Sequence, residues 1–279
     1  MKTLFTALLL STATFAAQAQ SAPAFTSSCD DSKWGSSEQK RYCETRDLTL
    51  PALKSGTLTV DGNRNGGITV KGYSGSDIRV RARVQAWAKD EATAKALVDG
   101  VKVSTEGNTL RGAGPDGSGS NSGYAVSGGG GYSVSYEIFV PEKTALALKT
   151  HNGGIHLENL RGPVSFEAQN GGVSIVAAGG DVKGRTQNGG LSITLTGTKW
   201  DGPGLDVATT NGGITWKVPA DYSAQFTTST QHGPVRTDFS SSVKGNISRS
   251  EVAVALGKGG APVKAVTVNG GVSVSRTGN

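Results

Sequence analysis

The chain has 279 residues, of which 41 are glycine and only 6% are aromatic, and its formal net charge is +6. So much glycine can indicate disorder, but here the glycines recur at regular intervals between β-branched runs, which is typical of turns in a repeating β structure. The mild positive charge suits contact with an anionic surface. The sequence has no cluster of basic residues with aromatic residues between them, which argues against nucleic-acid binding.

The first residues have the pattern of a secretion signal. Lys2 precedes a short apolar run, Leu4–Ala17, and Ala17-Gln18-Ala19 fits a small-x-small cleavage rule. We expect residues 1–19 to be removed and the mature chain to reach the periplasm or the outside of the cell. The apolar run is too short to cross a bilayer and no later segment has the length of a membrane helix, so we expect no transmembrane segment in the mature chain.

Two cysteines, Cys29 and Cys43, follow the signal. In an oxidising compartment a pair this close predicts a disulfide, which would tie down residues 20–46. Closing a loop of about 15 residues should contribute on the order of 3 kcal/mol. The alternative is a thiol nucleophile or a metal pair, but the spacing fits no metal motif and no histidine lies nearby.

Residues 65–141 predict elements that differ from the rest of the chain. NGGITVKGY at Asn65 is an early copy of a unit that recurs later. Ile78–Val84 alternates strictly and predicts a strand, while Asp90–Asp99 has the apolar stripe of a helix. The remaining predictions are short strands near residues 101–104 and 109–112, a Gly/Ser-rich loop over 113–131 and a strand over Tyr132–Val140.

From Asn152 onward the sequence follows a nine-residue period. Each unit opens on a Gly-Gly or Gly-Pro turn and then alternates apolar and polar residues, which predicts a strand with one buried face. Two buried side chains gain roughly 1.5–3 kcal/mol each, less than the backbone ordering cost of about 1–2 kcal/mol per residue. No unit can therefore fold alone, and the units must stack.

Asparagine begins every second unit, at Asn152, Asn170 and Asn188, so one coil has about 18 residues. The sequence thus predicts an all-β fold: a β-solenoid with two strands per coil and an N-terminal strand/helix insertion. The asparagines should form a hydrogen-bonded ladder along one edge. After an insertion over residues 197–201 the pattern resumes, with turns at Asn211, His232 and Asn269.

This alignment predicts the register of the second strand in each coil. Phe166 should lie over Gly184, with a large side chain beside a small one. Glu167 should lie beside Arg185, and Lys183 beside Asp206, each about 4.8 Å away along the axis. The last pair requires the insertion over residues 197–201 to loop out wholly.

These features together resemble the bacterial putative-adhesin family of β-strand-repeat envelope domains. The matching features are the NGG turns, the Ile-Arg-Val-Arg-Ala strand, the helix at Asp90, the strand that ends at Pro141 and the coils of about 18 residues. The resemblance covers residues 47–279, with the solenoid array mainly over 144–279. It implies an envelope-facing β-solenoid with roles in adhesion or envelope stress, and it transfers no catalytic residues.

Candidate binding residues come from the outward positions of the repeat. Four of them, His156, Ser174, Ser192 and Thr215, share one position and predict an exposed row without bulky charge, where a ligand of the array would bind.

Arg79, Arg81 and Arg83 share one face of a strand, which is either a solvated face or a contact for anionic envelope polymer or lipid head groups.

Three kinds of chemistry find little support in the sequence. His151 and His156 frame a turn but lack a third metal ligand, since His232 lies far along the array. A glycan-cleaving site needs carboxylates close together on one face, whereas Glu158 and Glu167 fall on opposite strands of the coil. There is also no G-x-S-x-G motif. We therefore expect no catalytic residues, no metal and no cofactor.

The sequence favours a non-catalytic exported interaction protein. Its partners would be cell-envelope polymer, glycan or another protein, and not nucleic acid. The alternatives are a glycan-active β-helix enzyme and an accessory domain in envelope stress sensing.

Overall fold

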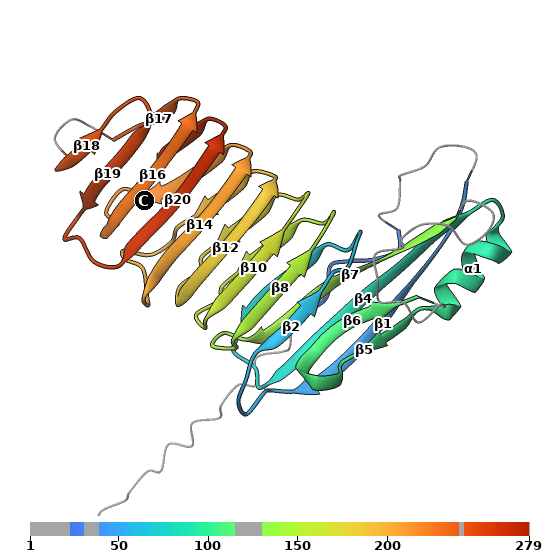
Figure 1. The fold of residues 1–279 in the computed structure, drawn as a ribbon. Coiled ribbons are helices and arrows are strands. Elements are labelled where there is room, and N and C mark those ends of the chain that lie inside the picture. The colour runs from blue at the N-terminus through green and yellow to red at the C-terminus, as the bar shows by residue number, and fades with distance from the viewer. Residues whose placement is uncertain (1–22, 31–38, 115–129, 240–242, 279) are drawn as a thin grey trace, which may run out of the picture.

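The computed structural model describes residues 23–30, 39–114, 130–239 and 243–278 (Figure 1). The expected signal peptide over residues 1–19 and most of the Gly/Ser-rich segment over residues 113–131 lie outside the described residues. Within the described residues the fold is all-β with one α-helix, α1 (Glu91–Gly100), and a short 3-10 turn at Glu106–Asn108. No described helix has the length and apolar character needed to cross a membrane.

The strands form two large mixed sheets, neither of which closes on itself. In spatial order sheet A contains β1 (Lys40–Pro51), β4 (Asp77–Ala88), β7 (Gly131–Pro141), β3 (Ile68–Tyr73), β9 (Ile155–Glu158), β11 (Val173–Val176), β13 (Leu191–Thr194), β15 (Ile214–Pro219), β21 (Val272–Thr277) and β17 (Val235–Thr237). Sheet B contains β18 (Gly245–Ile247), β19 (Glu251–Leu256), β16 (Ala224–His232), β20 (Pro262–Asn269), β14 (Gly204–Asn211), β12 (Asp181–Asn188), β10 (Val164–Ala168), β8 (Leu146–Thr150), β2 (Leu58–Asp61), β6 (Thr109–Ala113) and β5 (Lys102–Ser104).

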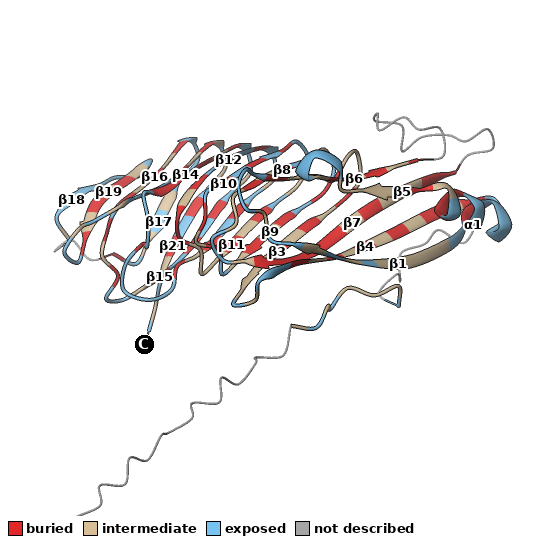
Figure 2. Ribbon diagram, turned by 90° about the horizontal axis from the view of Figure 1, so that it is seen from below, coloured by how far each residue is buried: buried red, intermediate tan, exposed pale blue. Residues whose placement is uncertain are grey.

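From β8 to β15 the chain passes alternately through sheet B and sheet A, and neighbouring strands within each sheet are parallel. Over residues 152–196, positions four and six of each unit are buried, except for the half-buried Gly184, as the period-two pattern predicts (Figure 2). Phe166 lies opposite Gly184, and a Cβ at Gly184 would lie 2.4 Å from the Phe166 ring. The expected large-beside-small packing is therefore confirmed.

The asparagine ladder is also confirmed. Each side-chain amide donates to the amide oxygen of the asparagine in the neighbouring coil, at 2.7–3.0 Å. The ladder runs through Asn65, Asn152, Asn170, Asn188, Asn211 and Asn269. Buried threonines support the same turns from inside; Thr186, for example, donates to the carbonyl of Gly171 at 2.8 Å. Most of the turns are thus held by one exposed and one buried hydrogen bond, while Ala168 takes the threonine position before the turn at Asn170.

The stacking order departs from chain order at both ends of the repeat. The early copy is in contact with the later ones, since β3 pairs with β9 and β2 with β8. Near the C-terminus, β20 lies between β14 and β16 (Figure 1), and β21 lies between β15 and β17. The last repeat in sequence is therefore inserted before the one that precedes it. Beyond β16, sheet B ends with β19, which is antiparallel to β16, and with the edge strand β18.

The predicted register is confirmed before the insertion, where Glu167 pairs with Arg185, and across it, where Lys183 pairs with Asp206. The ion pairs go to other partners, however: Lys149 reaches Glu167 at 4.0 Å, and Lys264 reaches Asp206 at 3.6 Å. These contacts are exposed, so each contributes only about 0–1 kcal/mol.

The expectation that residues 197–201 loop out wholly is wrong. Trp200 is buried, and its indole N–H donates to the carbonyl of Gly180 at 2.9 Å. Burial of one large aromatic side chain explains why the insertion stays against the core while the strands on either side keep their register.

The predicted helix is present one residue later than expected. It begins after Asp90, whose carboxylate accepts from the backbone N–H of Thr93 at 2.8 Å, as an N-cap does. Its buried face, Ala94, Leu97 and Val98, packs on β1 and β4. The predicted strand over Tyr132–Val140 is β7, which lies antiparallel to β4 and parallel to β3.

Candidate functional site

A groove of about 840 Å³ runs across the outer face of sheet A. Its central lining is the predicted row of His156, Ser174, Ser192 and Thr215. These residues are direct neighbours in the strand pairing of β9, β11, β13 and β15, so the row is continuous in register. Strands lie about 4.8 Å apart, which gives the row its axial repeat.

The row is available to a ligand. Ser192 and Thr215 are exposed, and His156 and Ser174 are half-buried. Within the described residues the hydroxyls of Ser174, Ser192 and Thr215 make no hydrogen bond. A hydroxyl offers one donor and two acceptor positions, so these side chains can bind polar groups without breaking an internal contact.

The third-position glycines of the NGG turns form a second row beside the hydroxyls. Gly154, Gly172, Gly190 and Gly213 all line the groove and are exposed. A Cβ at Gly172 would lie 3.5 Å from the nearest atom, an ordinary contact, so packing does not require glycine at this position. The absence of side chains here keeps the groove open.

The second-position glycines have a different role. A Cβ at Gly171 would lie 2.0 Å from the carbonyl oxygen of Gly153, inside the backbone of the neighbouring coil. The same short approach occurs at Gly153, Gly189, Gly212 and Gly270. In the turns at Asn152, Asn170, Asn188 and Asn211 the second glycine is thus needed for stacking, while the third lines the groove. The sequence shows that both turn positions are glycine, but the repeat pattern alone does not show that the two glycines have different roles.

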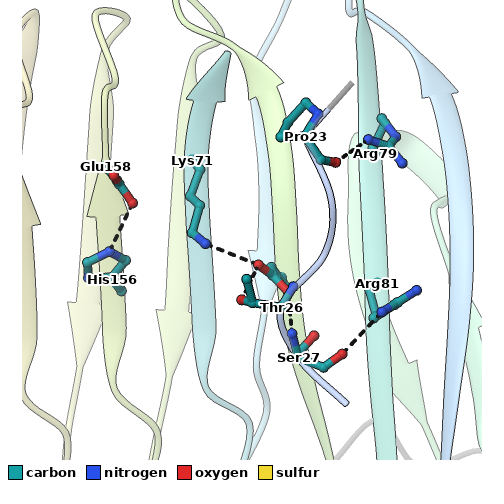
Figure 3. Close-up of polar contacts among 9 residues, drawn as sticks. Pro23, Thr26, Ser27, Lys71, Arg79, Arg81, His156 and Glu158 are labelled. Carbon is teal, nitrogen blue, oxygen red and sulfur yellow. Dashed lines mark hydrogen bonds and ion pairs between the residues drawn. The ribbon is translucent and has the colours of Figure 1, made fainter. Parts of the chain in front are cut away.

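One end of the groove is formed by an N-terminal strap, residues 23–30, which lies across the outer face of β7 and β4 (Figure 3). Thr26 and Ser27 of the strap line the groove together with Arg83 and Glu137. The strap is linked to β1 by the predicted disulfide, Cys29–Cys43, which is confirmed with a Cα–Cα distance of 5.7 Å. The ring of Phe25 packs on Phe139, with 5.3 Å between centroids.

Glu137 holds the strap in place. Its carboxylate accepts from the backbone N–H and hydroxyl of Thr26 at 2.9 and 2.8 Å, from the N–H of Ser27 at 2.8 Å and from Lys71 at 3.1 Å. Burial raises the pKa of Glu137, but the hydrogen bonds from Ser27, Thr26 and Lys71 outweigh it and lower the pKa to about 2. Sequence reasoning missed this residue, although Glu137 is the one charged residue within the predicted strand Tyr132–Val140.

The three arginines of β4 lie half-buried beneath the strap, and each donates to one of its backbone carbonyls. Arg79 reaches Pro23 at 2.6 Å, and both Arg79 and Arg81 lie over the ring of Phe25. Arg81 also holds Asp47 with two hydrogen bonds of 2.7 Å. The chain itself thus partly covers the arginine face, which was predicted to be either solvated or in contact with an anionic surface. Contact of this face with an anionic surface stays a prediction.

The residues considered for metal binding or glycan cleavage lie at separate places among the described residues. His156 lies 3.5 Å from Glu158 (Figure 3), and no group of three potential metal ligands occurs among the described residues. Glu158 and Glu167, the carboxylates considered for glycan cleavage, lie in sheet A and sheet B respectively. The arrangement suits binding along a surface.

Comparison with known proteins gives a distant structural likeness. No family model and no curated protein matches the chain. A putative cell adhesion protein from Clostridium sporogenes aligns with a TM-score of 0.39 and 11% identity, covering 84% of this chain and 100% of that one. A putative adhesin from Bacteroides fragilis aligns with a TM-score of 0.33 and 12% identity over 85% and 97% of the two chains.

A putative lipid binding protein from Parabacteroides distasonis aligns with a TM-score of 0.31 and 12% identity over 84% and 96%. The names of the first two agree with the family that the NGG repeats resemble. Likenesses of this size carry no functional argument.

Proposed function

We propose that the chain is a non-catalytic, exported binding protein of the cell envelope or the extracellular space, and that the groove on sheet A binds an extended polar polymer. The observation that carries this proposal is the unbroken row of His156, Ser174, Ser192 and Thr215 on the groove floor. The disulfide supports export, because such bonds persist in oxidising compartments.

The shape of the groove favours a chain over a compact ligand. From Thr69 in β3 to Thr215 in β15 the row crosses five neighbouring strands, a length of about 19 Å at the usual strand spacing. Its floor offers hydroxyls and glycine backbone and little charge, so a polymer with repeated hydroxyl or amide groups fits it best.

The alternation of the chain between the two sheets supports describing residues 144–279 as a β-solenoid array within an adhesin-like domain over 47–279.

The test is binding of the mature protein to purified envelope polymers, namely peptidoglycan, lipopolysaccharide and capsular polysaccharide. Ser174→Glu and Ser192→Glu, each made alone, place a charged side chain in the groove without touching the core. Ser165→Glu is the matched control, because Ser165 occupies the same repeat position on the exposed face of sheet B.

We expect both groove variants to lose binding to the polymer that the wild-type protein retains, while the control keeps it and all variants keep the wild-type Tm. Unchanged binding by the groove variants, or equal loss in the control, would remove the groove as the site.

A further inference from the structure

Arg83 differs from the other two arginines of β4 in its position and its partners. It lines the groove, whereas Arg79 and Arg81 do not. Among the described residues it donates one hydrogen bond, from Nη1 to the carbonyl of Ser28 at 3.3 Å. Within the described residues no carboxylate lies within ion-pair distance of Arg83, while Arg81 is held by Asp47.

The end of the groove next to the strap carries an excess of positive charge. Around the strap, the three arginines of β4 and Lys71 lie against three carboxylates, Asp47, Glu137 and the exposed Asp30 of the strap itself. Four cations and three carboxylates leave a net charge of +1 for these seven side chains. Asp47 and Glu137 already accept hydrogen bonds from other partners, so neither is available to compensate Arg83.

This end also has unmet hydrogen-bonding capacity. Arg83 Nε and Ser27 Oγ are buried atoms without a partner among the described residues, and both residues line the groove. An unsatisfied buried donor is costly, more so on a charged group. An anionic group is the partner that a guanidinium binds most strongly, because the hydrogen bonds are charge-assisted and can be bidentate.

We infer that the groove takes an acidic polyhydroxylated chain, and that Arg83, with Ser27 beside it, receives a carboxylate of that chain at the strap end. This inference rests on the proposed function: the hydroxyl and glycine rows bind the body of the chain, and Arg83 selects for its charge. The strap then closes the groove beyond Arg83, so that the acidic group docks against a fixed end wall.

The experiment uses two hexasaccharides that differ only in charge, β-linked hexamannuronate and the corresponding neutral mannohexaose. Binding of each to the mature wild-type protein, Arg83→Gln, Arg83→Lys and Ser174→Glu is measured by titration calorimetry at low and high salt. We expect wild-type protein to bind the uronate about ten-fold or more tightly than the neutral sugar, a preference of the size expected for one charge-assisted contact. Added salt should reduce this preference.

Arg83→Gln should bring the two affinities within about three-fold of each other, and Arg83→Lys, which keeps the charge, should retain part of the preference. Should Arg83→Gln not fold, the lysine variant carries the test through its partial loss. Equal binding of the two sugars by wild-type protein, or an unchanged preference in Arg83→Gln, overturns the inference; if Ser174→Glu still abolishes binding, the proposed function survives. If neither hexasaccharide binds, the inference is overturned as well. Whether the groove is a binding site is then decided by the binding assay with purified envelope polymers.

Discussion

The two glycines of the NGG turn at Asn170 should respond in opposite ways to the same substitution. Gly171→Ala places a methyl group 2.0 Å from the carbonyl oxygen of Gly153 and 2.6 Å from its carbon. Gly172→Ala places it 3.5 Å from the carbonyl oxygen of Gly190. Neither glycine has a left-handed φ, so the backbone itself accepts alanine at both positions.

The magnitudes follow from these contacts. Overpacking a well-packed site usually costs about 1–3 kcal/mol, and here the obstacle is backbone that the ladder holds in place, so Gly171→Ala should cost about 3 kcal/mol or more. Gly172→Ala should be neutral or stabilising by about 0.4–1 kcal/mol, because alanine reduces the entropy of the unfolded chain. For a protein of this size the first change lowers Tm by about 6–12 °C, and the second raises it by no more than about 4 °C.

Thermal unfolding followed by circular dichroism, with urea unfolding as a second measurement, compares the two variants directly. Each is the other's control, since they differ by one position in the same turn. Equal Tm values, or a larger loss for Gly172→Ala, would refute the assignment of stacking to the second glycine and groove shape to the third.

Three further predictions concern the contacts that hold the coils and the strap. Asn188→Ala, which removes one hydrogen bond to each neighbouring coil, should lower the free energy of unfolding by about 1–3 kcal/mol in urea titration; a change below about 0.5 kcal/mol would mean that the exposed ladder adds little. The pKa of Glu137 is lowered from 4.5 to about 2, so its contribution, up to about 3 kcal/mol, should be present above pH 4.5 and lost as the pH falls toward 2; a Glu137→Gln variant should lack this acid-sensitive component, and an identical pH profile in the variant would contradict it. Reduction of Cys29–Cys43, or replacement of both by serine, should cost on the order of 3 kcal/mol and increase hydrogen exchange in residues 23–28, and unchanged exchange there would show that the strap is held without the bond.

The periodicity of the sequence predicted most of the repeat. It did not predict the order of strands within the sheets where several repeat units compete for the same neighbour. Alternation, the asparagine ladder and the pairing of Phe166 with Gly184 all follow from repeat spacing, because stacked units must share one register. The insertion of β20 and β21 between earlier strands has no local signal, since any NGG unit can pair with any other. The burial of Trp200 was missed because an insertion was assumed to carry no core residue.

The candidate site divides in the same way. The hydroxyl row could be predicted, because one outward position of the repeat supplies all of it. The strap could not, because its contacts join residues about 110 positions apart, such as Thr26 and Glu137. The arginines of β4 were recognised as one face, but the sequence does not show that the N-terminal segment lies across that face and leaves only Arg83 against the groove.

The chain contains three histidines, and one of them lies in the groove. His156 is on the groove floor, whereas His151 lies near the asparagine ladder and His232 at the far end of the stack. Imidazole resonances recorded by NMR during titration with the envelope polymer that the protein retains therefore test whether the groove is the binding site, with two internal references. The His156 signals should move in a saturable way while those of His151 and His232 stay in place. Saturable shifts at either of the other two histidines, with His156 unmoved, would contradict it.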